Sequence, residues 1–68
     1  MPITIRLNGE NRSLDNHTSV LDLLELFELS PQRVIVERNR QIVDRDSIDQ
    51  VTLEDGDDIE IIRLVSGG

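Results

Sequence analysis

The sequence contains no cysteine, tryptophan or tyrosine, and it has one histidine, His17, and one phenylalanine, Phe27. Without cysteine there is no disulfide framework, no thiolate nucleophile and no thiolate metal site. A single histidine cannot build a histidine-rich metal cluster, and a single aromatic ring leaves no platform on which nucleic-acid bases could stack. A chain of 68 residues also leaves little room for a deep pocket, so we do not expect an enzyme.

Lysine is absent as well, so all seven basic residues are arginines, and fourteen acidic residues bring the net charge to −7. Such a charge repels nucleic acid and anionic membranes and attracts basic protein surfaces. No long apolar run or signal-peptide pattern occurs, so we expect a cytoplasmic protein with protein partners, and no nucleic acid or membrane partner. The missing lysine reflects either codon bias or protection of an activated acyl group from side-chain amines.

The first part of the chain predicts a β-hairpin. Residues 3–7 alternate between apolar and polar side chains, as in a half-buried strand. Asn8-Gly9 follows at once, and this pair favours a two-residue hairpin because both residues tolerate positive φ. Residues 12–15 form the predicted return strand.

A helix is predicted next, because the apolar period changes from 2 to 3.6. Ser19 and Asp22 match the capping-box pattern at its start, and Pro31 ends it. The apolar stripe of this helix is Val20, Leu23, Leu24 and Phe27.

In the remaining chain we predict a central strand at residues 34–36, a short edge strand at residues 41–43 and a helical turn at residues 45–50. A tight turn at residues 54–57 and a last strand at residues 59–65 follow. The right-handed crossover rule places the first and last strands side by side in parallel. The predicted fold class is α+β, a β-grasp with a mixed sheet of four to five strands and one main helix on one face. Residues 1–65 form the predicted domain, and residues 66–68 a flexible C-terminal diglycine tail.

The tail suggests a specific chemistry. Gly67 and Gly68 have no Cβ and could enter a narrow channel, and residues 65–68 could reach roughly 13 Å when extended. A free carboxylate needs activation, for example by adenylation, before a nucleophile can attack it. The sequence has no phosphate-binding glycine loop, so we expect ATP to be bound by a separate activating enzyme, and this chain to hold no cofactor and no metal. Without cysteine, any carried sulfur would sit on Gly68 as a thiocarboxylate.

Both faces of the last predicted strand are partly apolar. We interpret Ile59 and Ile61, on one face, as core residues. Ile62 and Leu64, on the other face, would then form with Val65 a partner-docking patch beside the tail. The alternative is that both faces pack inside the protein.

Charged residues in the second half admit plainer interpretations. Asp55, Asp57 and Asp58 lack the ligand spacing of a calcium-binding loop, so we predict a solvated turn. We interpret three arginines as balancing nearby carboxylates rather than contacting a partner: Arg38, Arg40 and Arg45 against Asp44, Asp46 and Asp49.

Four segments resemble the thiamine-biosynthesis sulfur carrier proteins, the ThiS family. In chain order they are Ser19-Val20-Leu21-Asp22-Leu23-Leu24, Asn39-Arg40-Gln41-Ile42-Val43-Asp44-Arg45, Asp55-Gly56-Asp57-Asp58-Ile59 and Val65-Ser66-Gly67-Gly68. The similarity extends over the whole chain. Asp-Gly-Asp alone is a common turn, but its combination with Asn-x-x-Ile-Val-x-Arg and a closing diglycine is fairly specific.

The resemblance implies a ubiquitin-like fold and a sulfur carrier for thiazole formation in thiamine biosynthesis. It implies that an E1-like, ThiF-type enzyme adenylates Gly68, that a cysteine desulfurase or another persulfide donor converts it to a thiocarboxylate, and that a ThiG-type thiazole synthase takes the sulfur. Ser66 and Gly67 would be the tail that approaches these enzymes. Ile62 matches a position that is often aromatic in the family and faces its partners, so the aliphatic residue here leaves the docking detail open.

Three other functions stay open at this point. A carrier like the small subunit of molybdopterin synthase would feed a different acceptor, although such relatives are often longer and have other residues before the glycines. A protein modifier would form isopeptide bonds through Gly68. A non-carrier β-grasp module would only bind proteins, and removing Gly67 and Gly68 would then change nothing.

Overall fold

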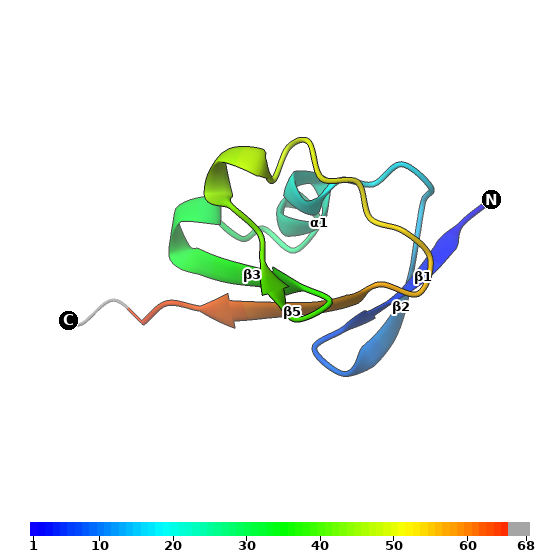
Figure 1. Cartoon of the computed structure of the whole chain (residues 1–68), viewed down its shortest axis with the longest axis horizontal. Coiled ribbons are helices and arrows are strands. Elements are labelled where there is room, and N and C mark those ends of the chain that lie inside the picture. The colour runs from blue at the N-terminus through cyan, green and yellow to red at the C-terminus, as the bar shows by residue number, and fades with distance from the viewer. Residues whose placement is uncertain (66–68) are drawn as a thin grey trace.

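The computed structural model describes residues 1–65, which form a five-stranded mixed sheet with one α-helix against one face (Figure 1). The elements are β1 (Ile3–Leu7), β2 (Glu10–Leu14), α1 (Val20–Leu26), η1 (Pro31–Arg33), β3 (Val34–Arg38), β4 (Gln41–Ile42), η2 (Arg45–Ser47) and β5 (Asp58–Arg63), where η1 and η2 are single 3₁₀ turns. The strand order is β2-β1-β5-β3-β4. This order, with one helix on one face, confirms the predicted β-grasp class. Within residues 1–65 no helix is long and apolar enough to cross a membrane.

The β1–β2 hairpin follows from its turn residues. Asn8 and Gly9 have φ of 49° and 85°, the left-handed values that the shortest hairpin turns need. The turn places Leu7 opposite Glu10. The return strand therefore begins at Glu10, two residues earlier than predicted.

β5 lies between β1 and β3 in the middle of the sheet. It runs parallel to β1, as predicted, with Leu7 opposite Ile59, and antiparallel to β3, with Val34 opposite Arg63. β5 ends at Arg63 rather than at residue 65, because β3 begins at Val34 and leaves little strand to pair with.

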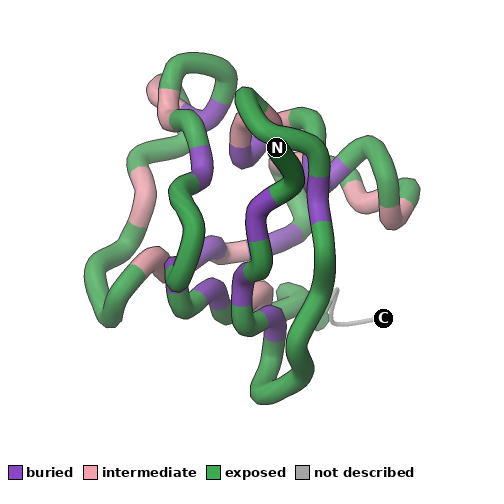
Figure 2. The backbone as a smooth tube through the Cα atoms, turned by 90° about the vertical axis from the view of Figure 1, so that its right-hand side faces the viewer, coloured by how far each residue is buried: buried purple, intermediate pink, exposed green. Residues whose placement is uncertain are grey.

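The helix α1 covers one face of the sheet and begins at the predicted capping box. The backbone N–H of Asp22 donates to Ser19 Oγ (3.0 Å), and the backbone N–H of Ser19 donates to Asp22 Oδ2 (3.1 Å). Twelve buried apolar residues form the core, and Figure 2 colours the buried positions along the backbone. They are Ile3, Ile5, Leu7, Leu14, Val20, Leu23, Leu24, Val34, Val36, Ile48, Leu53 and Ile59. Truncating such a side chain typically costs about 2–5 kcal/mol, so this core is the main stabilising element of the domain.

The helix ends in a Schellman motif around a residue that is not glycine. The N–H of Leu29 donates to the carbonyl of Leu24 (2.9 Å), and the N–H of Glu28 donates to the carbonyl of Glu25 (3.0 Å). Glu28 has φ of 57°, where a Cβ is strained and glycine is preferred. The Schellman end of α1 therefore forms even though the backbone of Glu28 is strained.

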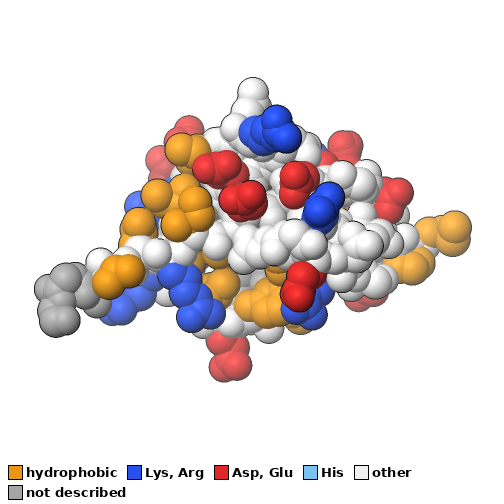
Figure 3. Space-filling view, turned by 90° about the horizontal axis from the view of Figure 1, so that it is seen from below, with side chains coloured by type: hydrophobic (Ala, Val, Ile, Leu, Met, Phe, Trp, Pro, Cys, Tyr) orange, Lys and Arg blue, Asp and Glu red, His pale blue; other side chains and the backbone are white. Residues whose placement is uncertain are grey.

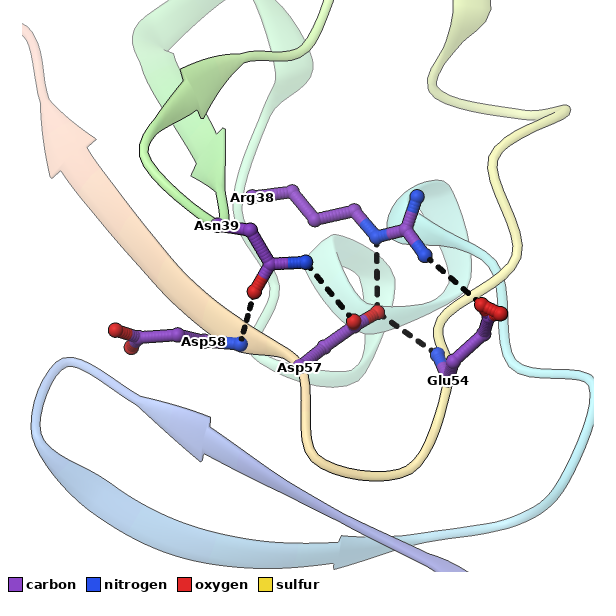
Figure 4. A network of polar contacts seen from close by, with 5 residues as sticks. All are labelled: Arg38, Asn39, Glu54, Asp57 and Asp58. Atoms are coloured by element: carbon purple, nitrogen blue, oxygen red, sulfur yellow. Dashed lines mark hydrogen bonds and ion pairs between the residues drawn. The ribbon is translucent and has the colours of Figure 1, made fainter.

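A polar network ties the start of β5 to the β3–β4 turn (Figure 4). Asp57, only 6% exposed, accepts hydrogen bonds from Arg38 Nε (2.8 Å), Asn39 Nδ2 (3.1 Å) and the backbone N–H of Glu54 (2.8 Å). Asn39 Oδ1 also accepts from the N–H of Asp58 (3.0 Å). The prediction of a solvated turn is therefore wrong for Asp57, because three donors replace its water.

The network lowers the pKa of Asp57. Burial alone would raise it, but the hydrogen bonds from Glu54, Arg38 and Asn39 and the charge of Arg38 outweigh burial and bring the pKa below the ordinary 3.8. A lowered pKa means that the folded state favours the ionised form. The stabilisation is complete above the ordinary pKa and is lost as the pH falls through the folded value.

Two of the arginines have partners other than those predicted. Arg38 pairs with Asp57 and, at 3.6 Å, with Glu54. Arg45 donates to the backbone carbonyls of Pro31 (2.9 Å) and Val34 (3.2 Å). Both side chains connect segments of the fold. Arg38 does pair with carboxylates, but not with the predicted ones, whereas Arg45 bonds backbone carbonyls instead of a carboxylate.

We predict that Asp57→Asn lowers the free energy of unfolding by about 1–3 kcal/mol at neutral pH, because it weakens charge-assisted hydrogen bonds inside the fold. Urea denaturation at pH 7 measures the loss. Between pH 5 and pH 2, the variant should lose less stability than the unsubstituted protein, since it lacks the carboxylate that acid would protonate.

The neighbouring exposed residue supplies the control, because Asp58→Asn removes a carboxylate whose side chain points away from the network (Figure 4). It should change stability by less than about 0.5 kcal/mol. Equal losses for the two variants would show that the Asp57 network does not stabilise the fold.

We also predict that Glu28→Gly raises the free energy of unfolding by about 0.5–1 kcal/mol, because glycine adopts the positive φ without strain. Thermal unfolding followed by circular dichroism measures the change. The matched variant Glu25→Gly, inside α1, should lower stability by about 1 kcal/mol. A loss of stability in Glu28→Gly would contradict the strain assigned to this position.

Candidate functional site

The predicted site begins where the chain leaves the sheet after β5. The N–H of Leu64 donates to the carbonyl of Arg33 (2.8 Å), one residue beyond the paired strands. The next residue, Val65, is 92% exposed. The predicted tail residues Ser66, Gly67 and Gly68 lie outside the described residues.

The two faces of β5 separate as predicted. Ile59 is fully buried and Ile61 packs half-buried against the core, whereas Ile62 is 44% and Leu64 46% exposed. The alternative, in which both faces pack inside the protein, is therefore wrong. The exposed pair lies on the sheet face opposite α1.

Two further isoleucines enlarge this apolar surface. Ile35 of β3 lies directly opposite Ile62. Ile42 of β4 is 70% exposed and lies opposite Glu37, which is two residues from Ile35 and therefore on the same face. We name Ile35, Ile42, Ile62 and Leu64 the outer patch, and Figure 3 shows hydrophobic side chains gathered on this face next to the end of the described chain.

Acidic side chains border the outer patch. Glu37 and Glu60 lie directly opposite each other on β3 and β5, and Figure 3 shows acidic side chains beside the hydrophobic ones. Like charges in opposed positions of a sheet repel each other. A basic side chain of a partner placed between them would relieve that repulsion.

The described residues contain no candidate metal site. Within residues 1–65, no three of the His, Cys, Asp and Glu side chains are placed to hold a metal ion. Asp57, whose pKa is shifted, is engaged inside the fold with Arg38. His17 is exposed in a turn. The arrangement suits a surface that binds a partner and presents the end of β5.

Comparison with known proteins gives consistent matches. The model of the ThiS family matches residues 5–68. The sulfur carrier protein ThiS of Bacillus subtilis is 38% identical over 65 residues, which cover 94% of this chain and 98% of that protein. The crystal structure of a thiamine biosynthesis protein (ThiS) from Geobacter metallireducens superposes with a TM-score of 0.82 at 28% identity, covering 97% of this chain and all of that one.

Longer proteins match as well. A thiazole synthase of Magnetococcus marinus is 36% identical over 64 residues, and one of Paramagnetospirillum magneticum is 39% identical over 62 residues. The chain spans only about a fifth of the length of either synthase, 20% and 19%. A domain similar to this one thus occurs within proteins named thiazole synthase.

Proposed function

The chain belongs to the ThiS family, and from this premise we propose that it carries sulfur for the thiazole ring of thiamine as a protein co-substrate rather than an enzyme. One observation carries the proposal: β5 places an exposed apolar face beside the point where the chain leaves the sheet toward Gly68. The matching Bacillus subtilis protein, named a sulfur carrier, supports the same role.

The reactive group of this proposal is the Gly68 carboxylate. One of its oxygens attacks the α-phosphorus of ATP held by an E1-like, ThiF-type enzyme, and pyrophosphate leaves. The resulting acyl-adenylate is electrophilic, so the terminal sulfur of a persulfide, supplied by a cysteine desulfurase or another donor, displaces AMP. A thiol reductant then cleaves the sulfur–sulfur bond and leaves a thiocarboxylate on Gly68.

The acceptor in this proposal is a ThiG-type thiazole synthase. Two proteins named thiazole synthase contain a segment similar to this chain, and proteins that act together are often joined in one polypeptide. This favours a thiazole synthase as the sulfur acceptor over an acceptor enzyme of molybdenum-cofactor assembly. Because the cycle needs ATP and reducing thiols, we assign it to the cytoplasm.

The globular body would remain outside both active sites and provide the docking surface. In this proposal Ile62 and Leu64 of the outer patch, together with Val65, contact the partner, while Ser66 and Gly67 lead Gly68 into the active site. A surface that combines apolar side chains with the acidic pair Glu37 and Glu60 fits a partner that is apolar in the centre and basic at its rim.

We predict that incubation with a ThiF-type enzyme, ATP, a persulfide donor and a thiol raises the intact mass by the difference between one sulfur and one oxygen. Electrospray mass spectrometry of the whole protein reads this change, and fragmentation places it on Gly68. Omitting ATP should abolish it, since a carboxylate is not electrophilic enough to react.

The control variant is Gly68→Val, which places a branched side chain next to the carbonyl that must be attacked. It should show no mass change while its circular dichroism spectrum stays that of the unsubstituted protein. If the unsubstituted chain kept its mass with an enzyme that charges another carrier, the proposed function would be rejected.

We further predict that Ile62→Glu weakens binding to a ThiF-type enzyme or thiazole synthase at least about tenfold, because it places a charge in the apolar contact. Isothermal titration calorimetry measures the affinity. The matched variant Leu26→Glu changes an exposed leucine of α1, on the other face of the sheet, and should bind normally. Equal effects of the two substitutions would contradict docking through the outer patch.

A further inference from the structure

Along one edge of β5, only some of the backbone N–H and C=O groups form hydrogen bonds with the neighbouring strand. Residues of a strand point their N–H and C=O groups alternately to either side. The N–H of Asn39 donates to the carbonyl of Asp58 (2.8 Å), and the N–H of Leu64 donates to the carbonyl of Arg33 (2.8 Å), so even-numbered residues of β5 face the β3 side. The odd-numbered residues therefore face β1.

β1 is too short to pair with all of the odd-numbered residues. The N–H of Asn8, just after β1, donates to the carbonyl of Ile59 (2.9 Å). The side chain of Asn8 then acts as the next rung, because its Oδ1 accepts from the N–H of Ile61 (2.9 Å) and its Nδ2 donates to the carbonyl of Ile61 (3.4 Å). The next residue that faces this side is Arg63, and its N–H and C=O meet no backbone partner within residues 1–65.

A groove lies along this open edge and encloses about 170 Å³. Its floor contains Phe27, Leu29 and Ile61, which pack against the core but keep part of their surface exposed. Arg12 and Arg63 line it as well, and the Arg12 guanidinium lies 5.4 Å from the centre of the Phe27 ring. An extended backbone entering the groove would meet an apolar floor and two cationic side chains.

The charge around this groove differs from that of the whole chain. Three arginines, Arg12, Arg33 and Arg63, line this groove or the adjoining one, against two glutamates, Glu10 and Glu28, while the net charge of the protein is −7. Glu10 pairs with Arg12 at 3.6 Å, and both side chains remain largely exposed. Figure 3 shows arginine side chains along the edge of the molecule near the end of the described chain.

We propose that an extended, acidic segment of the thiazole synthase adds to β5 at this edge, with its backbone bonded to Arg63 and a carboxylate between Arg12 and Arg63. Strand addition of this kind derives affinity from main-chain hydrogen bonds. The inference rests on the proposed function, since it concerns the protein that receives the tail. A second copy fits less well, because pairing two β5 edges would bring the two sets of arginines together.

A pair of substitutions at one position separates the backbone from the side chain. Arg63→Ala removes the charge and keeps the N–H, whereas Arg63→Pro removes both. Proline is compatible here because the Arg63 N–H does not serve the β3 pairing, and the residue before proline is already extended. Against purified thiazole synthase, we expect Arg63→Ala to bind a few-fold more weakly, and Arg63→Pro about tenfold more weakly than Arg63→Ala.

The control is Arg40→Ala, which removes an exposed arginine from the β3–β4 turn at the other end of the sheet, and it should keep its affinity within twofold. Equal affinities of Arg63→Pro and Arg63→Ala would overturn the proposal, because the backbone would then not be used. The proposal would also be overturned if the chain formed dimers without the synthase and Arg63→Pro dissociated them. The edge of β5 would then pair with a second copy of the chain.

Hydrogen exchange of the unsubstituted, ¹⁵N-labelled chain tests the same edge without any variant. Saturating thiazole synthase should slow the exchange of the Arg63 amide about tenfold or more, and that of the Leu64 amide, already bonded to Arg33, much less. Unchanged exchange at Arg63 would overturn the strand addition. If the mass change on Gly68 still occurs, the carrier function stands; if that change itself fails, the proposed function fails first.

Discussion

The arrangement of this small domain depends on the parallel pairing of β5 with β1 in the middle of the sheet. The N–H groups of Arg6 and Asn8 donate to the carbonyls of Asp57 and Ile59, at 2.8 and 2.9 Å. Because the two strands run in the same direction, β5 travels away from the end at which β1 begins (Figure 1). The chain therefore leaves the sheet at the end opposite the N-terminus, and the surface beside that exit is available to a partner.

The start of β5 is also tied to other segments of the fold through the side chain of Asp57. Asp57 accepts hydrogen bonds from Arg38 at the end of β3, from Asn39 directly after it and from the backbone of Glu54, so it joins segments 18 and 19 residues apart in the chain. Sequence patterns could not reveal this, because Asp57 lies between two other aspartates at 55 and 58 and only the folded chain brings Arg38 to it. Short-range patterns were more informative: Asn8-Gly9 predicted the hairpin, and Ser19 with Asp22 predicted the start of α1, since both depend on neighbours in the chain.

The sequence predicted those parts of the candidate site in which successive side chains of a strand point to opposite faces of the sheet. The spacing of Ile59, Ile61 and Ile62 assigned the faces of β5 correctly. Ile35 was missed as part of the outer patch, because the continuous apolar run of residues 34–36 carries no alternation and indicates a strand buried on both faces. The role of Asn8 as a rung for Ile61 was missed as well, because the two residues are 53 positions apart and meet only where β1 ends.

The central claim is that sulfur travels on the end of this chain to the thiazole ring. The most direct measurement charges the protein with a heavy sulfur isotope, removes the donor, and adds thiazole synthase with its small-molecule substrates. The account predicts that the thiazole product contains the heavy isotope, up to one sulfur per charged chain, while the protein loses the label. A product without the isotope, or a charged chain that keeps its label beside an active synthase, would contradict it.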